Sequence, residues 1–495
     1  MNFVTDVLER FPASKPALLA IDREGARRVW HFGELVAMSA GVSGALAARG
    51  VGRGDVVMTL IGNRVEWVLT LLACWRMGAV ALPVNTQLRR HDLELRVSAA
   101  QPVICVGESD LLAELPEGVP ALDLEEFARI LDEDRPQETP APLADLGARD
   151  PALIVFTSGT TGEPRGALHS AGYLTGQAVQ AEHWLGARKD DLCWCTTATG
   201  WSKSARNVFV APWLRGAAAL ISDARFDAAE RLALVEREGV NVLCQAPTEY
   251  RMLAKRGELR KLPELRRMVS AGEPLNPEVI RVFRERMGLD IADGYGQTET
   301  GQITGNRVGE EVRVGSMGRV LPGFEARIDA PRGEPGELQV RAASCPTFFD
   351  RYLDESRSDA RARLVDGDWW PTGDVVRSDE DGYLFYEGRD DDLILSSGYR
   401  IGPFEVESAL LSHPAVAEAA AVGMPDAERG AVVCAVVVLR EGEPGEGLAQ
   451  ELREHVKRVT APYKAPRVVE FARELPKTAS GKIRRAELRA RADAP

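Results

Sequence analysis

The sequence predicts an α/β protein, with a large N-terminal domain of stacked, mostly parallel sheets and a smaller α+β C-terminal domain. Apolar runs typical of buried strands recur through the first 390 residues, and amphipathic helical stretches separate several of them. After about Asp391 the pattern changes to two long apolar runs followed by a helical stretch. At 495 residues the chain is also too long for one ordinary domain.

Strands and helices alternate in the predicted large domain, as in βαβ units. The expected strands are Val56–Ile61, Ala79–Val84, Val103–Val106, Ala152–Phe156, Leu192–Thr197, Ala217–Ser222 and Val240–Ala246. The expected helices between them include Val65–Met77 and Ala228–Glu238. Near Gly315–Arg389 we expect a small β-barrel.

The predicted small domain consists of strands Val416–Val422 and Ala431–Leu439 and a helix near Leu448–Val459. The boundary falls within the charged, glycine-containing segment Gly388–Asp392, because such segments serve as hinges. The predicted domains are therefore 1–390, a large domain, and 391–495, a small mobile domain with its hinge near Asp391.

Composition excludes several classes of protein. Hydrophobic residues make up 45% of the chain and charged residues 27%, as in soluble enzymes. The net charge of −13 argues against nucleic-acid binding, which needs a basic surface. No apolar run is long enough to span a bilayer, and Met1–Asp6 lacks the features of a targeting signal. Seven scattered cysteines without zinc-like spacing favour free thiols and a cytoplasmic location.

The strongest local motif, Thr157–Gly166, follows the expected strand Ala152–Phe156. Its glycines allow backbone N–H groups to converge on an anion, its hydroxyls add donors, and Arg165 adds a cation suited to phosphate. The motif lacks the Gly-Lys-Ser/Thr ending of a Walker A loop, and Gly294–Glu299 lacks the last glycine of a dinucleotide fingerprint. Considered alone, the motif could be an ordinary surface turn.

Further motifs follow along the chain: Gly272-Glu273-Pro274, Asp293–Thr300, Thr372-Gly373-Asp374, Gly388–Asp392 and Leu475–Lys482. In their order and spacing, these motifs and Thr157–Gly166 resemble the superfamily of AMP-forming acyl-CoA synthetases, adenylation domains and luciferases. The resemblance covers nearly the whole chain. The stretches Ile394–Glu407, His413–Val416, Pro425–Gly430 and Thr460–Lys464 resemble the medium-chain acyl-CoA synthetases in particular. The alternative is a chance collection of turns and salt bridges.

The resemblance implies a two-step reaction with ATP, Mg²⁺ and CoA. A carboxylate attacks the α-phosphate of ATP to give acyl-AMP and pyrophosphate, and the CoA thiol then displaces AMP. This chemistry needs positive charge arranged around phosphate. We therefore expect a carboxylic acid, ATP and CoA as partners and an acyl-CoA, AMP and pyrophosphate as products, with a homodimer left open.

The resemblance also assigns the nucleotide site. The phosphates are expected on Thr157, Ser158, Gly159, Thr160, Thr161, Gly162 and Arg165, and the adenosine on Gly272, Glu273, Pro274, Gly294, Tyr295, Gly296, Gln297, Asp374 and Arg389. Glu299, with Thr157, is the expected Mg²⁺ ligand, and Thr298, Glu299 and Lys482 are the expected catalytic residues. The structural alternatives are a helix-terminal carboxylate for Glu299, surface ion pairs for Asp374 and Arg389, and a solvated lysine for Lys482.

For the thioester step the resemblance implies rotation of the small domain about Asp391. CoA is then expected on Ser397, Gly398, Tyr399, Arg400, Arg429, Tyr463 and Lys464. A solvated basic face is the alternative for the last three of these.

The expected acyl pocket consists of Trp201, Ser202, Lys203, Ala271 and Gly296. Gly296 stands where acetyl-CoA synthetases carry a tryptophan, so acetate is not expected as the preferred substrate. The run Ser202–Asn207 departs from the mostly apolar pattern of the medium-chain relatives. Because a buried unpaired cation is costly, this run suggests a substrate with a polar or anionic tail. The alternative is that these side chains turn toward solvent or a CoA phosphate.

Two other departures concern Arg165, where the family usually has lysine, and His169, which either lines the site or packs in a helix. The predicted function is activation of a medium-chain or aromatic acid, with a polar tail left open. The alternatives are loading of a carrier-protein phosphopantetheine, non-catalytic binding of a nucleotide or acyl-adenylate, and a luciferase-like oxygenase.

Overall fold

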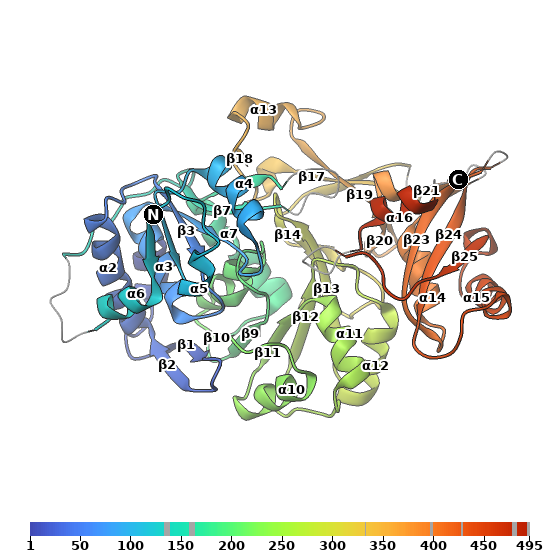
Figure 1. The fold of residues 1–495 in the computed structure, drawn as a ribbon, viewed down its shortest axis with the longest axis horizontal. Coiled ribbons are helices and arrows are strands. Elements are labelled where there is room, and N and C mark those ends of the chain that lie inside the picture. The colour runs from blue at the N-terminus through green and yellow to red at the C-terminus, as the bar shows by residue number, and fades with distance from the viewer. Residues whose placement is uncertain are drawn as a thin grey trace.

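The computed structural model describes residues 1–132, 139–157, 164–331, 333–396, 399–426, 429–477 and 483–492. Two large sheets form most of its N-terminal part (Figure 1). The nine-stranded sheet has the order β15-β14-β13-β12-β11-β9-β10-β1-β2 and is parallel from β13 to β1. Its strands are β1 (Pro16–Ile21), β2 (Arg27–His31), β9 (Leu192–Cys195), β10 (Ala218–Ser222), β11 (Val242–Gln245), β12 (Arg267–Ala271), β13 (Ile291–Gln297), β14 (Gly301–Gly305) and β15 (Arg319–Val320).

The seven-stranded sheet has the order β18-β8-β7-β4-β3-β5-β6 and is parallel from β7 to β6. Its strands are β3 (Val56–Leu60), β4 (Val80–Pro83), β5 (Ile104–Gly107), β6 (Ala121–Asp123), β7 (Pro151–Phe156), β8 (Gly166–Ser170) and β18 (Arg351–Tyr352). All the strands expected in this part of the chain are present, with ends within two residues of the prediction. Parallel strands are buried on both faces, which is why they read as continuous apolar runs.

Helices cover both faces of each sheet. Alternate residues of the two sheets, such as Leu18 and Val57, pack in one core with Trp67, Trp184 and Phe209. The helices of this N-terminal part are α1 (Phe3–Val7), η1 (Leu8–Arg10), α2 (Phe32–Ala48), α3 (Val65–Met77), α4 (Arg90–Ala100), α5 (Ser109–Leu112), α6 (Leu124–Ile130), α7 (Ala171–Gly176), α8 (Ala178–Gln180), η2 (Ala181–Leu185), η3 (Arg206–Val210), α9 (Ala211–Leu214), α10 (Ala228–Arg237), α11 (Pro247–Arg256) and α12 (Pro277–Met287). A second core joins α10, α11 and α12 to the opposite face of the nine-stranded sheet.

The expected small barrel is instead an open antiparallel sheet in the order β16-β17-β19-β20, and among the described residues its outer strands do not pair with each other. The strands are β16 (Ala326–Asp329), β17 (Gly336–Arg341), β19 (Trp369–Ser378) and β20 (Leu384–Arg389), with η4 (Ala342–Ser344) and α13 (Arg357–Ala362) between them. The alternating pattern gives antiparallel strands but does not decide whether a sheet closes.

A five-stranded sheet follows η5 (Asp390–Asp392) and lies at one end of the molecule (Figure 1). It contains β21 (Ile394–Ser396), β22 (Tyr399–Ile401), β23 (Val416–Asp426), β24 (Gly430–Leu439) and β25 (Val468–Phe471), with α14 (Pro403–Leu411), α15 (Glu446–Val459), η6 (Pro462–Lys464) and α16 (Arg485–Ala492). Val406, Leu452 and Val456 pack against the sheet in a separate core. In the described part of the chain, no helix has both the length and the apolar character needed to cross a bilayer.

Candidate active site

An open cavity of about 2230 Å³ lies at the carboxyl ends of the parallel strands, where loops commonly build binding sites. Its floor comes from the ends of β7, β12 and β13, and its wall includes β19, β20 and residues of the C-terminal sheet. The predicted residues that line it are Thr157, Arg165, Trp201, Ser202, Lys203, Gly272, Glu273, Pro274, Gly294, Tyr295, Gly296, Gln297, Thr298, Glu299, Asp374 and Arg389. Motifs that span more than 230 positions of sequence therefore meet in one space.

Asp374 lies at the centre of the nucleotide side of this cavity. The carboxylate is 5% exposed and accepts hydrogen bonds from the Tyr295 hydroxyl at 2.5 Å and from Gln297 Nε2 at 2.8 Å. Arg389 NH1 approaches it at 3.4 Å. Burial raises the pKa of Asp374, while Arg389 and the two hydrogen bonds oppose that rise. The residues expected at the adenosine thus contact each other directly.

Glu299 and Arg165 are connected through Tyr352. The Tyr352 hydroxyl donates to Glu299 Oε1 at 2.6 Å, and the Arg165 guanidinium carbon lies 3.9 Å from the centre of the Tyr352 ring. Arg165 also forms ion pairs with Asp354 at 2.8 Å and Glu355 at 2.7 Å. Arg165 therefore stands beside the expected Mg²⁺ ligand with its charge already paired.

The structure describes only the two ends of the predicted phosphate-binding segment Thr157–Gly166. Thr157 follows β7, and Thr157 Oγ1 accepts from the Arg165 backbone N–H at 3.4 Å. The predicted residues Ser158, Gly159, Thr160, Thr161 and Gly162 lie outside the described residues.

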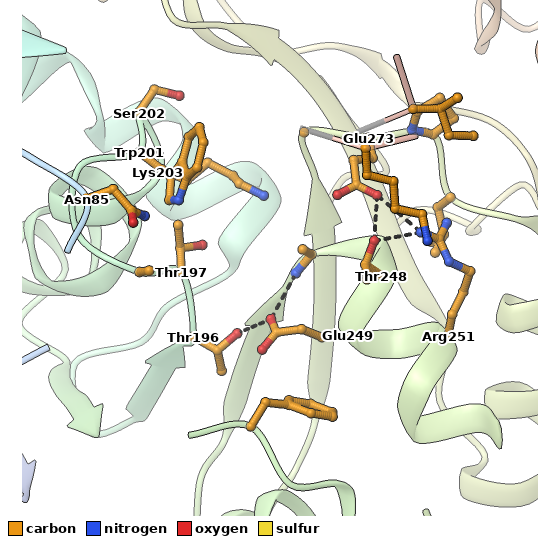
Figure 2. Close-up of a pocket in the computed structure, with 18 of the residues that line it drawn as sticks. Asn85, Thr196, Thr197, Trp201, Ser202, Lys203, Thr248, Glu249, Arg251 and Glu273 are labelled. Atoms are coloured by element: carbon orange, nitrogen blue, oxygen red, sulfur yellow. Dashed lines mark hydrogen bonds and ion pairs between the residues drawn. The ribbon is translucent and has the colours of Figure 1, made fainter. Parts of the chain in front are cut away.

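The rim of the cavity opposite Trp201 carries a polar network from α11 (Figure 2). The Thr248 hydroxyl donates to Glu273 Oε2 at 2.8 Å, and Arg251 NH2 reaches Thr248 Oγ1 at 2.6 Å and Glu273 at 3.3 Å. The Thr196 hydroxyl donates to Glu249. This network holds the Gly272-Glu273-Pro274 turn, where the adenine is expected.

The connection before Trp201 approaches the seven-stranded sheet closely. Gly200 has φ +85°, and a Cβ placed there would lie 2.2 Å from the backbone nitrogen of Asn85. Only glycine tolerates both conditions. Beyond it, the Lys203 ammonium donates to the carbonyl oxygen of Ala271 (Figure 2 shows Lys203 beside Trp201). Ala271 itself is 2% exposed and is not among the residues lining the cavity, contrary to the prediction that its side chain shapes the acyl pocket.

Gly296 lines the cavity, and the structure gives a reason for glycine at this position that differs from the expected one. A Cβ at Gly296 would lie 1.8 Å from the carbonyl oxygen of Gly301, because β13 and β14 approach each other closely there, next to a register shift between Tyr295 and Gly296. The hairpin backbone itself therefore requires glycine at this position.

Of the two alternatives for His169, the structure shows the second: the side chain packs against a helix. The ring is fully buried on β8, its centre lies 4.1 Å from that of the Tyr173 ring on α7 with the planes tilted by 37°, and it is absent from the cavity lining. Burial, with a smaller contribution from the charge of Arg206, lowers the pKa of His169 to about 3.

A separate groove of about 460 Å³ on the C-terminal sheet brings together Tyr399, Arg429 and Tyr463. The rings of Tyr399 and Tyr463 are stacked at 4.3 Å, and Arg453, Lys457 and Arg467 add further positive charge. Lys464, expected with them, donates instead to Glu405 and does not line this groove.

Several predicted site residues of the C-terminal part lie outside the described residues. They are Lys482, Ser397 and Gly398, together with the side chains of Asp391 and Arg400. Lys477 and Ile483, which flank the Lys482 segment, both line the large cavity.

Sequence reasoning missed Tyr352 and the network around Glu249. Tyr352 belongs to an aromatic run that reads as ordinary core, and no local signal links it to Glu299. The α11 residues could have been found, because a helix that begins directly after a buried parallel strand starts at the same edge of the sheet as the motifs.

The fold and this cavity define an adenylate-forming enzyme. The AMP-binding enzyme family matches residues 4–352, and the C-terminal domain of the same enzymes matches residues 405–482. The chain belongs to this family. It is an AMP-forming acyl-CoA synthetase, which uses ATP to convert a carboxylic acid into an acyl-AMP and then transfers the acyl group to CoA.

Three similar proteins illustrate the relationship. The chain is 39% identical to mouse mitochondrial acyl-coenzyme A synthetase ACSM3, over 99% of this chain and 90% of that protein. It is also 39% identical to the uncharacterized acyl–CoA ligase YtcI of Bacillus subtilis, over 99% and 96% respectively. The crystal structure of the anthranilate CoA ligase AuaEII with anthranoyl-AMP has a TM-score of 0.89 and 30% identity, covering 100% of this chain and 97% of that one.

Proposed function

We propose that this synthetase acts on a medium-chain or aromatic carboxylic acid rather than on acetate, and that the acid lies between Trp201, Ser202, Lys203 and Gly296. The observation that carries the proposal is the open cavity of about 2230 Å³, which is lined by Trp201, Ser202, Lys203 and Gly296. A small acid would leave this space unfilled, and unfilled apolar space forfeits dispersion contacts. One of the similar proteins is named for anthranilate and another only for an acyl group, so the family relationship does not select the acid.

In this proposal Asp374 accepts hydrogen bonds from the ribose hydroxyls and Arg389 stands beside them. The hydrogen bonds from Tyr295 and Gln297 hold the carboxylate in place before ATP arrives. Thr298 contacts the reacting carboxylate or the α-phosphate, and Lys482 supplies positive charge to the transition state. Lys477 and Ile483, which flank the segment that contains Lys482, line the same cavity.

Glu299 is suited to Mg²⁺ because that ion binds through one or two carboxylates together with substrate phosphates. No group of three or more His, Cys, Asp or Glu side chains suited to a metal occurs within the described ranges, which agrees with a site completed by ATP. Magnesium would neutralise phosphate charge during the first step. Thr157, at the start of the phosphate-binding segment, is the second proposed ligand.

Free CoA is the proposed acceptor, since the groove at Tyr399 and Tyr463 combines a pair of stacked rings with several cations. Arginine and lysine bind phosphate groups, and aromatic faces bind nucleotide bases. A carrier protein would present the same thiol arm without the nucleotide and would not need this groove. In this proposal the groove delivers CoA in a second orientation, after the part of the chain beyond Asp391 has rotated.

All seven cysteines are free and buried, which fits a reducing compartment, and we place the enzyme in the cytoplasm, in the metabolism of fatty or aromatic acids.

The deciding experiment measures pyrophosphate release with ATP and Mg²⁺ across a panel of acids, each with and without CoA. The panel spans C2 to C12 chains, benzoates and dicarboxylates. Acid-dependent pyrophosphate, with acyl-CoA formed when CoA is added, supports the proposal. Acyl-AMP that accumulates without transfer to CoA would favour a carrier-protein acceptor, and activity with acetate alone would contradict the proposed pocket.

A further inference from the structure

A buried guanidinium without an acidic partner lies in the wall of the acyl side of the cavity. Arg206 is 3% exposed and begins the π-helix η3. Within the described ranges no carboxylate pairs with it, and its Nε and NH1 atoms are buried without a hydrogen-bond partner. Arginine stays charged in proteins, and a buried charge without a counter-charge strongly opposes folding. Because Arg206 also lines the cavity, a bound molecule can supply the missing anion.

The groups behind Arg206 are polar but cannot neutralise it. Both ring nitrogens of His169 and the hydroxyl of Tyr173 are buried without hydrogen-bond partners. The charge of Arg206 reaches both side chains, since it helps to lower the pKa of His169 and opposes the rise that burial causes in the pKa of Tyr173. This wall therefore contains a cation and neutral dipoles, and an anion is what it lacks.

Lys203, three residues before Arg206, has polar partners within the protein. Its ammonium donates to the Ala271 carbonyl, and it lies within electrostatic reach of Asp293, whose carboxyl it partly stabilises in the charged form. The two cations are thus not equivalent, and Arg206 is the one that requires a partner from outside the protein.

Arg206 lies close to the hairpin that carries the proposed catalytic residues. NH1 lies 3.5 Å from the point that a Cβ would occupy at Gly301. Gly301 pairs with Gln297 across the hairpin whose turn carries Thr298 and Glu299. The guanidinium is consequently on the acyl side of the same hairpin that carries the proposed catalytic residues.

We propose that the acid activated by this enzyme carries a second carboxylate on its tail, and that Arg206 binds this carboxylate in the wall of the acyl pocket. The inference rests on the proposed function, namely that the cavity beside Trp201 holds the acid. The planar guanidinium matches a carboxylate with two parallel hydrogen bonds. A monocarboxylic acid of the same length would leave the guanidinium buried and unpaired, which disfavours that substrate.

The test compares pairs of acids that differ in one carboxylate: hexanoate with hexanedioate, octanoate with octanedioate, and benzoate with benzene-1,4-dicarboxylate. The quantity measured is kcat/KM for acyl-CoA formation in the wild type and in Arg206→Met and Arg206→Lys. We expect the wild type to favour at least one dicarboxylate over its partner. Arg206→Met should lower kcat/KM for that dicarboxylate about 10- to 100-fold, the range expected for a lost charged hydrogen bond, and should not lower it for the monocarboxylate. Arg206→Lys should recover part of the loss.

Arg215→Met is the matched control, because Arg215 lies on the same stretch of chain, is paired with Glu182 at 2.9 Å and is absent from the cavity lining. It should leave both acids of each pair unchanged. A wild type that activates monocarboxylates but no dicarboxylate would overturn the inference and leave the proposed function intact. An equal loss for both acids in Arg206→Met would also overturn it. Absence of pyrophosphate release with every acid would instead contradict the proposed function. The wild-type preference is measured without any substitution, so the test does not depend on the folding of a variant.

Discussion

At the scale of the residue, Asp374 shows how neighbours prepare a carboxylate for a ligand. Its hydrogen bonds come from Tyr295 and Gln297 on β13, whereas Asp374 itself lies on β19. Burial makes the charged form costly, and these donors, together with Arg389, offset that cost. A carboxylate held in this way would lose little side-chain freedom on binding the ribose, as proposed.

The first prediction concerns Asp374→Asn. An amide cannot accept from two ribose hydroxyls as a carboxylate does, so the KM for ATP should rise about 10- to 100-fold, as expected for a lost charged hydrogen bond. ATP–pyrophosphate exchange measures this directly. Asp381→Asn is the control, because that side chain is 59% exposed, pairs with Arg313 at 2.8 Å and is absent from the cavity lining. An unchanged KM in Asp374→Asn would contradict the assigned role.

The second prediction concerns pH and His169. The pKa of His169 falls from 6.5 to about 3 on folding, so the folded protein binds fewer protons than the unfolded chain within this window. Its stability should therefore decrease as the pH falls below 6.5, by at most about 1.4 kcal/mol per pH unit from this group. Above that pH the ring is neutral in both states and causes no loss.

Urea denaturation at pH 7 and pH 5 tests this. His169→Phe keeps an aromatic ring beside Tyr173 and should lose less stability between the two pH values than the wild type does. His91→Phe, at a side chain that is 85% exposed, should behave like the wild type. Identical pH dependence in all three proteins would show that His169 does not carry the effect.

At the scale of the element, the turn that carries Trp201 is positioned by the close contact of Gly200 with the end of β4. A Cβ at Gly200 would meet the backbone nitrogen of Asn85 at 2.2 Å and the carbonyl carbon of Val84 at 2.6 Å. Backbone atoms cannot move aside as a flexible side chain can. The proposed acyl pocket therefore depends on the close contact of two segments that lie 115 positions apart.

The third prediction compares Gly200→Ala with Gly54→Ala. Both glycines have positive φ, +85° and +86°, but a Cβ at Gly54 meets no atom within 4 Å. Gly54→Ala should cost about 1–2 kcal/mol from backbone conformation alone. Gly200→Ala should cost a further 1–3 kcal/mol from the steric clash. It should also raise the KM for the acid, whereas Gly54→Ala should not.

Thermal unfolding and acid-dependent pyrophosphate release give these two quantities. Equal destabilisation by both substitutions would mean that the connection at Gly200 moves easily, and the pocket would then be less rigid than argued.

At the scale of the whole molecule, the C-terminal part packs closely against β20. The ring centres of Phe404 on α14 and Tyr386 on β20 lie 6.2 Å apart. Gly402 packs so closely that a Cβ there would lie 2.1 Å from the carbonyl oxygen of Glu387. The groove at Tyr463 is separate from the large cavity, and in the proposed mechanism rotation of the part after Asp391 brings a CoA bound there to the acyl-AMP.

The fourth prediction is that Asp391→Pro separates the two steps. Proline fixes φ and removes a degree of freedom at the proposed hinge. ATP–pyrophosphate exchange should stay within roughly tenfold of the wild type, while acyl-CoA formation should fall by about 100-fold or more, because misplaced reactants lose that much. Asp391→Ala retains rotational freedom and should support both steps. An equal loss of both steps in Asp391→Pro would indicate local disruption instead of a blocked rotation.

The sequence by itself determined the class of fold, seven strands of the two large sheets and the motifs that meet in the cavity. It could do so because buried parallel strands appear as apolar runs, and because their carboxyl ends, which carry Gly272 and Tyr295, share one edge of a sheet. The tertiary structure decided which polar atoms find partners. Lys464 pairs with Glu405 across 59 positions, Tyr352 with Glu299 across 53, and Arg206 with no carboxylate in the described residues. It also decided that the sheet from β16 to β20 stays open and that Ala271 is buried and does not line the cavity. Pairing and desolvation depend on residues that are distant in the chain, and a local pattern carries no record of them.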